Sequence, residues 1–159
     1  MILVLFGTAK IEFTRPLFEI EKLCKEGIIK EKIIVQCSRT KYNSIYFEMT
    51  PFFQPDELDA LIDKARLVIA HGGTGSILPA VKKGKKVIAV ARYAELNENS
   101  DNHQVEILNA LSKSNYIIPW YKESNLHDLI KQSENFIPSN YNSTKHFILN
   151  YLSNYILKS

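Results

Sequence analysis

A glycine-rich segment, residues 71–76 with the sequence His-Gly-Gly-Thr-Gly-Ser, stands between an apolar run and a segment with helical character. The apolar run 67–70 is typical of a buried strand, and residues 76–83, closed by Gly84, are typical of a helix. Glycine tolerates positive φ and lets a ligand approach the backbone closely. The free N–H groups and the dipole of a helix N-terminus attract an anion. The segment therefore predicts a phosphate or pyrophosphate site, with His71 as an additional side-chain donor.

Glycine-rich strand–helix turns can also serve packing alone, and that alternative stays open here. The segment is not a Walker loop, because no lysine follows its last glycine. It also lacks the G-x-G-x-x-G spacing of dinucleotide-binding turns, and it follows a middle strand rather than the first. Residues 6–10, Phe-Gly-Thr-Ala-Lys, lack that spacing too, which disfavours a nicotinamide-dependent oxidoreductase.

Short apolar runs alternate with amphipathic segments along the whole chain. We expect strands at residues 2–6, 33–37, 45–49, 67–70, 87–91 and 116–119. We expect helices at residues 14–26 with Thr14 as the cap, and at 55–65, 76–83, 101–113, 124–132 and 143–157. Continuous apolar runs are typical of a parallel sheet covered on both faces. The alternation predicts an α/β fold, a single Rossmann-like, doubly wound parallel sheet.

The length of 159 residues corresponds to one ordinary domain. We expect residues 1–134 to form the ligand-binding domain and residues 135–142 to form a linker. Residues 143–158 are then a C-terminal helix whose apolar stripe packs either on the domain or on a partner.

Charge and cysteine content narrow the class of protein. The net charge of +3 is small and scattered, so we expect no nucleic-acid partner. The one cluster, Lys82, Lys83, Lys85 and Lys86, is typical of a solvated turn, with contact to anionic lipid as the alternative. Two cysteines without metal-ligand spacing indicate free thiols in a reducing compartment. We find no basic leader before the first strand and no apolar run of about 18 residues, so we expect a cytoplasmic protein.

Three polar segments follow strands of the expected sheet. They are Gly7-Thr8 after the first strand, residues 71–76, and the long loop 92–102, which leads into Asp-Asn-His-Gln at 101–104. Ligands of doubly wound sheets bind beyond the carboxyl ends of the strands. The convergence of these segments favours a ligand site over a purely structural glycine turn.

Together these residues resemble the C-terminal, donor-binding half of family 28 glycosyltransferases of GT-B architecture. They are similar in particular to small subunits of split enzymes, such as the dolichol-linked GlcNAc transferase and the bacterial capsule and exopolysaccharide transferases. The resemblance covers about residues 1 to 130, and the pairing of His-Gly-Gly with Asp-Asn-His-Gln at this separation is specific. Its motifs are Gly7-Thr8, Phe13-x-Arg15, Pro51-Phe52, residues 65–77, Gly84-Lys85-Lys86, Arg92, Glu98 and residues 101–104.

The resemblance implies a UDP-sugar donor and a set of site residues. His71 and the glycine loop hold the diphosphate, the backbone of Gly7 and Thr8 approaches it, and Gln104 contacts donor-sugar hydroxyls. The region of Phe52 and Phe53 lies near the uracil. A purely structural role at the helix start stays open for His103. The candidate catalytic residue is His71, and the candidate substrate-binding residues are Gly7, Thr8, Phe53, Gly72, Gly73, Thr74, Gly75, Ser76, Arg92, Glu98, Asp101, Asn102, His103 and Gln104.

The chain departs from the family pattern at three positions. Relatives usually carry a glutamate for the ribose hydroxyls three residues after the serine of the glycine loop, where this chain has Pro79. A proline fits the first turn of a helix without cost, but it cannot accept a hydrogen bond from ribose. Ala91 stands where capsule relatives usually have proline, and Asn97 replaces a glycine before Glu98.

The resemblance also implies the reaction and its partners. We expect an inverting hexosyltransferase without a metal or other cofactor, because the chain has no Asp-x-Asp motif. It shows no general base, so we expect activity only with a membrane-anchored, acceptor-binding subunit, on a lipid-linked acceptor in polysaccharide or glycan biosynthesis. The chain is then peripheral at the inner face of the membrane through that partner. The alternative is a non-catalytic UDP-sugar-binding regulatory module.

Overall fold

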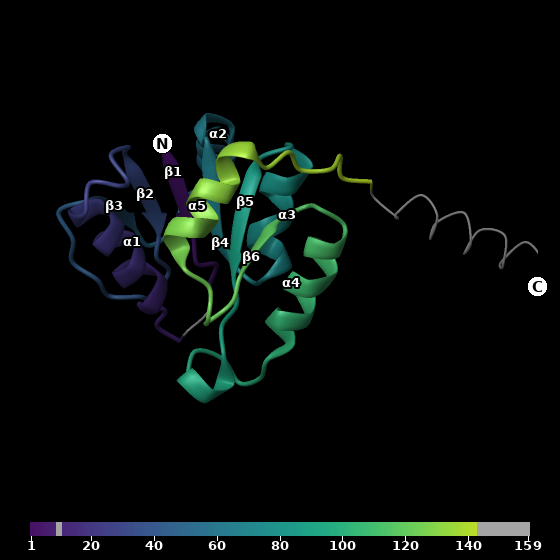
Figure 1. The fold of residues 1–159 in the computed structure, drawn as a ribbon. Helices are drawn as coiled ribbons and strands as arrows, with labels where there is room; N and C mark the ends of the chain where they lie inside the picture. Colours follow the sequence, from purple (N-terminus) through teal and green to yellow (C-terminus); the bar gives the residue numbers. More distant parts are fainter. Residues whose placement is uncertain (9–10, 143–159) are drawn as a thin grey trace, which may run out of the picture.

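The computed structural model describes residues 1–8 and 11–142 and has a six-stranded parallel sheet at its centre (Figure 1). The strand order is β3-β2-β1-β4-β5-β6, which confirms the predicted Rossmann-like sheet. Each strand is short, and all but the edge strand β3 are mostly buried, as the apolar runs predicted. The strands are β1 (Ile2–Leu5), β2 (Ile33–Gln36), β3 (Phe47–Thr50), β4 (Leu67–His71), β5 (Lys86–Val90) and β6 (Ile118–Trp120).

Helices cover both faces of this sheet. Apolar side chains of α1 (Arg15–Lys25) and α5 (Leu126–Asn135) pack on one face, against a cluster that includes Val4 and Ile69. Those of α2 (Pro55–Lys64), α3 (Thr74–Lys82) and α4 (His103–Lys113) pack on the other face. None of the helices in the described part of the chain is long and apolar enough to cross a membrane. The expected helix at 143–157 lies outside the described residues.

Several element boundaries differ from the sequence-based expectation. The third strand begins at Phe47 rather than at 45, because Ile45 is 93% exposed and does not join the sheet. Thr14 precedes α1, but its side chain makes no capping hydrogen bond, so that part of the prediction is wrong. Asn125 does cap α5, since its side chain accepts the N–H of His127 at 2.9 Å. A short 3₁₀ helix, η1 (Ala94–Leu96), was not predicted.

The start of α3 also corrects the interpretation of Pro79. The helix begins at Thr74, inside the glycine segment, so Pro79 lies in its second turn and not in its first. At that position a proline removes the hydrogen bond that its N–H would donate to the carbonyl of Gly75, four residues earlier. Pro79 therefore destabilises this helix by the loss of one backbone hydrogen bond.

The register of the central strands brings the predicted ligand segments to one edge of the sheet. Leu5, the last residue of β1, pairs with Gln36 on β2 and with Ala70 on β4. Gly7 and His71 follow these positions directly. The chain winds in opposite directions on the two sides of β1, so the crevice between the ends of β1 and β4 is the topological switch point where such sheets bind ligands.

Candidate functional site

A cavity of about 490 Å³ opens at this switch point. It unites the residues after β1, Gly7 and Thr8, with His71 and with the first turn of α3 at Gly75 and Ser76, as the sequence predicted. Its other walls come from the sheet and from the segment that leads into α2 and α3. These further lining residues are Leu5, Gln36, Phe52, Leu58, Ile62 and Pro79.

His71 is held between two glycines at the inner end of the cavity. A Cβ atom at Gly7 would overlap Nε2 of His71 and lie 3.1 Å from its Cδ2. A Cβ atom at Gly73 would overlap Cε1 on the other edge of the ring. Gly7 also has a φ of +68°, which strains any residue with a side chain. Both glycines are therefore required so that the imidazole can reach the switch point.

The protonation state of His71 follows from its contacts. The N–H of Gly73 donates a hydrogen bond to Nδ1 at 3.2 Å, so the proton of the neutral ring belongs on Nε2. Burial, and next the positive charge of Arg92, lower the pKa of His71 from 6.5 to about 4. At neutral pH the ring is therefore uncharged and offers Nε2–H as a donor.

The N-terminus of α3 supplies further donors. Gly73 is the N-cap residue, and its carbonyl accepts the N–H groups of Ser76 at 3.0 Å and Ile77 at 3.2 Å. The N–H groups of Thr74 and Gly75 precede the first bonds of the helix and have no acceptor within it. The first turn contains no acidic residue that would oppose an anion. Together with His71, this turn offers N–H donors of the kind that phosphate groups accept.

Arg92 lies behind the cavity rather than in its lining. Its side chain is 1% exposed, stacks on Phe13 at 4.4 Å and donates to the carbonyls of Ile11 at 2.9 Å and Glu98 at 3.2 Å. No carboxylate bonds to the guanidinium, and its Nε is the only buried side-chain polar atom without a partner among the described residues. Burial lowers the pKa of Arg92. This buried charge raises the electrostatic potential near His71 instead of touching a ligand from the cavity wall.

Glu98 fastens the loop after β5 to the rest of the domain. Its carboxylate accepts two hydrogen bonds from Arg15, at 2.8 Å and 2.9 Å, and a third from the N–H of Tyr93 at 3.2 Å. All these partners are protein groups, and Glu98 does not line the 490 Å³ cavity. The structure therefore gives Glu98 a role in holding this loop.

The Asp-Asn-His-Gln segment is likewise engaged in local contacts. The side chain of Asn102 accepts the N–H of Ala94 at 2.9 Å, and Asp101 accepts the N–H of His103 at 3.1 Å and pairs with its ring. Gln104 accepts the N–H of Arg92 at 3.1 Å through Oε1. None of these four residues lines the 490 Å³ cavity. Their contact with a donor sugar stays a prediction.

Gly72 provides the space for Gln104. A Cβ atom at Gly72 would lie 2.8 Å from Cβ and 2.9 Å from Oε1 of Gln104, closer than real Cβ contacts. The second glycine of the segment therefore serves packing of α4 against the end of β4. The packing interpretation of the glycine segment therefore applies at Gly72.

The two neighbouring phenylalanines have different roles. Phe53 is 5% exposed and belongs to the core, whereas Phe52 is 56% exposed and lines the cavity. Of the two residues expected near the uracil, only Phe52 lines this cavity. Gln36 was missed by the sequence analysis, although a polar residue that ends the apolar strand Ile-Ile-Val-Gln was a usable signal.

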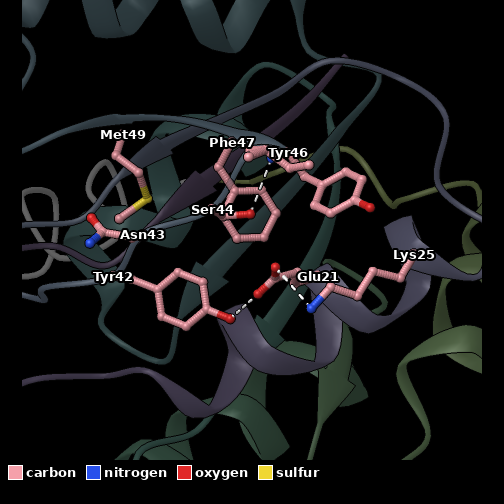
Figure 2. Close-up of a pocket in the computed structure, with 9 residues that line it drawn as sticks. Glu21, Lys25, Tyr42, Asn43, Ser44, Tyr46, Phe47 and Met49 are labelled. Carbon is pink, nitrogen blue, oxygen red and sulfur yellow. Dashed lines mark hydrogen bonds and ion pairs between the residues drawn. The ribbon is translucent and has the colours of Figure 1, made fainter.

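A larger cavity of about 650 Å³ lies elsewhere, between α1 and the edge strand β3 (Figure 2). Its wall carries one polar network, in which the hydroxyl of Tyr42 and the Nζ of Lys25, at 3.1 Å, both bind the carboxylate of Glu21. The hydrogen bond from Tyr42 lowers the pKa of Glu21, and burial raises the pKa of Tyr42 to about 12. The carboxylate is thus already paired, and the cavity shares no residue with the glycine loop. The smaller cavity is the candidate site.

The structure and the sequence agree on the relatives of this chain. A model of the glycosyltransferase family 28 C-terminal domain matches residues 1–154. The chain is similar to UDP-N-acetylglucosamine transferase subunit ALG13 of Yarrowia lipolytica, with 36% identity over 70 residues, 44% of this chain and 34% of that protein. The ALG13 subunit of Candida albicans is 30% identical over 88 residues, 55% of this chain and 28% of that protein. The chain thus spans about a third or less of the curated relatives it matches.

Solved structures show the same fold. An NMR structure of ALG13 matches with a TM-score of 0.59 and 17% identity over 89% of both chains. The crystal structure of MurG from Acinetobacter baumannii matches with a TM-score of 0.60 and 14% identity, over 83% of this chain and 41% of that protein. At these identities the likeness supports the architecture of the sheet and helices alone.

Proposed function

The chain belongs to the glycosyltransferase family 28 C-terminal domain family, and we propose that it binds the UDP-sugar donor of a split glycosyltransferase. The observation that carries the proposal is the position of His71 between Gly7 and Gly73, beside the open N-terminus of α3. This arrangement presents a side-chain N–H and backbone N–H groups to one point of the 490 Å³ cavity. A diphosphate fits that set of donors.

We infer that the donor is UDP-N-acetylglucosamine, because the curated relatives are named as subunits of a transferase of that sugar. The cavity has an apolar end at Phe52, Leu58 and Ile62 in addition to the anion end at His71. A pyrimidine at the apolar end and a diphosphate at the glycine loop match these two chemistries.

The reaction that this site supports is departure of UDP from the anomeric carbon of the sugar. Negative charge grows on the diphosphate as the bond to the sugar breaks, so donors that are already in place stabilise the transition state. The N–H groups of Thr74 and Gly75 and the Nε2–H of His71 are such donors. The buried guanidinium of Arg92 adds positive potential from behind the ring.

The base that removes the proton from the acceptor hydroxyl is expected on another subunit. Of the residues that line the cavity, only His71 has an acid–base side chain, and its Nδ1 already accepts the N–H of Gly73. We therefore propose a partner that is anchored to the membrane and that binds a lipid-linked acceptor. The word "subunit" in the names of the relatives supports such an assembly.

Sugar transfer by the reconstituted pair tests this proposal. The chain is purified alone and together with a membrane-anchored candidate for the acceptor-binding subunit from the same organism, and UDP release from UDP-N-acetylglucosamine is measured with a lipid-linked acceptor. We expect transfer by the pair, in the presence of EDTA, and none by the chain alone. Robust transfer by the single chain, or loss of activity on chelation that Mg²⁺ restores, contradicts the proposal.

A second candidate function, a regulatory module that binds UDP-sugar without turnover, is favoured by Pro79. This residue lines the cavity and has no side-chain group that could hold a ribose hydroxyl. Tight UDP-sugar binding with no UDP release from the reconstituted pair would support this alternative.

A further inference from the structure

We propose that the side-chain amide of Gln36 recognises the nucleoside part of the donor, by donating a hydrogen bond from Nε2 to the C4 carbonyl of uracil. This inference rests on the proposed function, because it assumes that the cavity binds a uridine diphosphate. It assigns a specificity-determining role to a residue that makes no contact with the glycine loop.

The orientation of the amide is fixed by the protein. Gln36 is the last residue of β2, and its Oε1 accepts the N–H of Phe53 at 3.1 Å. Only the oxygen of an amide can accept a hydrogen bond, so the position of Oε1, and with it that of Nε2, is determined. The residue is 4% exposed, and its side chain therefore has little freedom to turn.

The Nε2 group has no partner in the described part of the chain, yet it is not sealed from solvent. Phe53 is the sole hydrogen-bond partner of this side chain there. A buried and unpaired side-chain polar atom occurs only at Nε of Arg92 among the described residues. Nε2 of Gln36 therefore reaches open space, and the space that Gln36 lines is the 490 Å³ cavity. A preoriented donor without an acceptor at a cavity wall is suited to ligand recognition.

The position of Gln36 in the sheet places it near the nucleoside rather than near the diphosphate. Gln36 and Ala70 pair with Leu5 from opposite sides. Two strand spacings of about 4.8 Å separate them, so Gln36 lies roughly 10 Å from the end of β4, where His71 holds the anion end. On the side of Gln36, the exposed ring of Phe52 offers a surface for a base.

Few side chains of the cavity can compete for this role. The lining side chains with hydrogen-bonding groups are Thr8, Gln36, His71 and Ser76, and three of these belong to the segments at the anion end. Pro79, Leu58 and Ile62 offer only apolar contact. Selection of the nucleoside by a side-chain hydrogen bond therefore falls to Gln36.

The test replaces Gln36 by glutamate. A carboxylate of the same shape still accepts the N–H of Phe53 but has no N–H to donate. Gln54→Glu is the matched control, since it adds the same charge at an exposed residue close in sequence to Phe52 that does not line the cavity. Calorimetry measures the affinity of the three proteins for UDP and for pyrophosphate at pH 7.5.

We expect Gln36→Glu to bind UDP roughly 3- to 10-fold more weakly than Gln54→Glu, with equal pyrophosphate affinities for the two variants. Equal UDP affinities, or a loss of pyrophosphate binding as large as that of UDP binding, overturn the inference. Failure of the unaltered protein to bind UDP overturns the proposed function instead, so the two failures are distinct. Gln36→Met, which also removes the acceptor for Phe53, should melt at a lower temperature than Gln36→Glu.

Cytidine diphosphate identifies the acceptor. The unaltered protein should prefer UDP to CDP, because cytosine carries an amino group in place of the C4 carbonyl, and Gln36→Glu should lose that preference. A Gln36→Glu protein that keeps the preference at its original size overturns the assignment.

Discussion

The imidazole of His71 occupies the space that a side chain on Gly73 would need, since a Cβ atom there would overlap Cε1 and lie 3.0 Å from Nε2. The same ring blocks a side chain on Gly7 from its other edge. Because Gly73 is also the N-cap residue of α3, the position of the ring is coupled to the start of the helix proposed to bind the diphosphate. Changes at either residue should therefore alter ligand binding through the other.

Gly73→Ala tests this coupling. The added methyl group must displace the ring or the backbone, and such overpacking costs about 1–3 kcal/mol of stability. UDP affinity should fall together with stability. Gly75→Ala is the control for the fold, because a Cβ atom there meets no protein atom within 4 Å. Thermal melts and UDP titrations compare the two variants, and equal melting temperatures would contradict the steric argument.

His71→Ala removes the ring itself. The contact between Nε2–H and a charged diphosphate is worth about 1.5–3 kcal/mol of binding free energy, so UDP should bind at least about tenfold more weakly while the domain stays folded. His127→Ala, at an exposed position on α5, controls for loss of a histidine. Unchanged UDP affinity by calorimetry in His71→Ala would remove His71 from the site.

The pH dependence of stability follows from the lowered pKa of His71. Its value is about 4 in the folded protein against 6.5 as the reference for the unfolded chain. Between these values the unfolded chain binds a proton that the folded protein does not. The contribution is therefore fully present above pH 6.5 and is lost as the pH falls towards 4. Its slope is at most about 1.4 kcal/mol per pH unit.

Urea unfolding between pH 4 and 7 measures this slope in the unaltered protein and in His71→Gln, which cannot take up the proton. Carboxylates contribute equally to both proteins, so the difference between the two curves isolates His71. Parallel curves across this range would show that the ring is not held neutral by burial and by Arg92.

The sequence was sufficient for the sheet and for the meeting of the residues after β1 with the glycine segment. Continuous apolar runs and the glycine segment are local signals, and they correctly predicted six strands and the meeting of Gly7 with His71. The local pattern did not predict that Ile45 is exposed and lies outside the sheet. Ile45 is apolar like a strand residue, and only the three-dimensional structure shows that the edge strand β3 begins after it, at Phe47.

The sequence could not separate residues that touch the cavity from residues that support it. Arg92 and Glu98 are polar residues in the loop after β5, and Gln104 lies in the first turn of α4, positions that favoured direct contact with a ligand. Their partners lie far away in the sequence: Arg92 stacks on Phe13, and Glu98 binds Arg15. Such long-range pairs leave no periodic signal in a single sequence.

Glu98→Gln tests the supporting role. Arg15 donates two hydrogen bonds to the carboxylate, and the amide that replaces it can accept only on one side. We expect a loss of about 1–3 kcal/mol in the free energy of unfolding, measured by urea titration. Glu95→Gln, which breaks an exposed pair with Lys122, is the control and should cost less than about 1 kcal/mol. Equal small costs for the two variants would contradict the proposed anchoring of the loop.

Pro79 affects the site in two ways that two substitutions separate. Pro79→Ala restores the N–H that can bond to the carbonyl of Gly75, and it should stabilise the domain by about 1–3 kcal/mol without adding a polar group to the cavity.

Pro79→Glu restores the same N–H and adds a carboxylate at the cavity wall. If ribose recognition is weak because the proline cannot hydrogen-bond, Pro79→Glu should bind UDP at least as tightly as the unaltered protein and more tightly than Pro79→Ala. Calorimetry with UDP and with pyrophosphate measures this difference, and a gain confined to UDP locates it at the nucleoside. A clear loss of UDP affinity in a folded Pro79→Glu protein would instead mean that another residue already holds the ribose or that the glutamate clashes with the ligand.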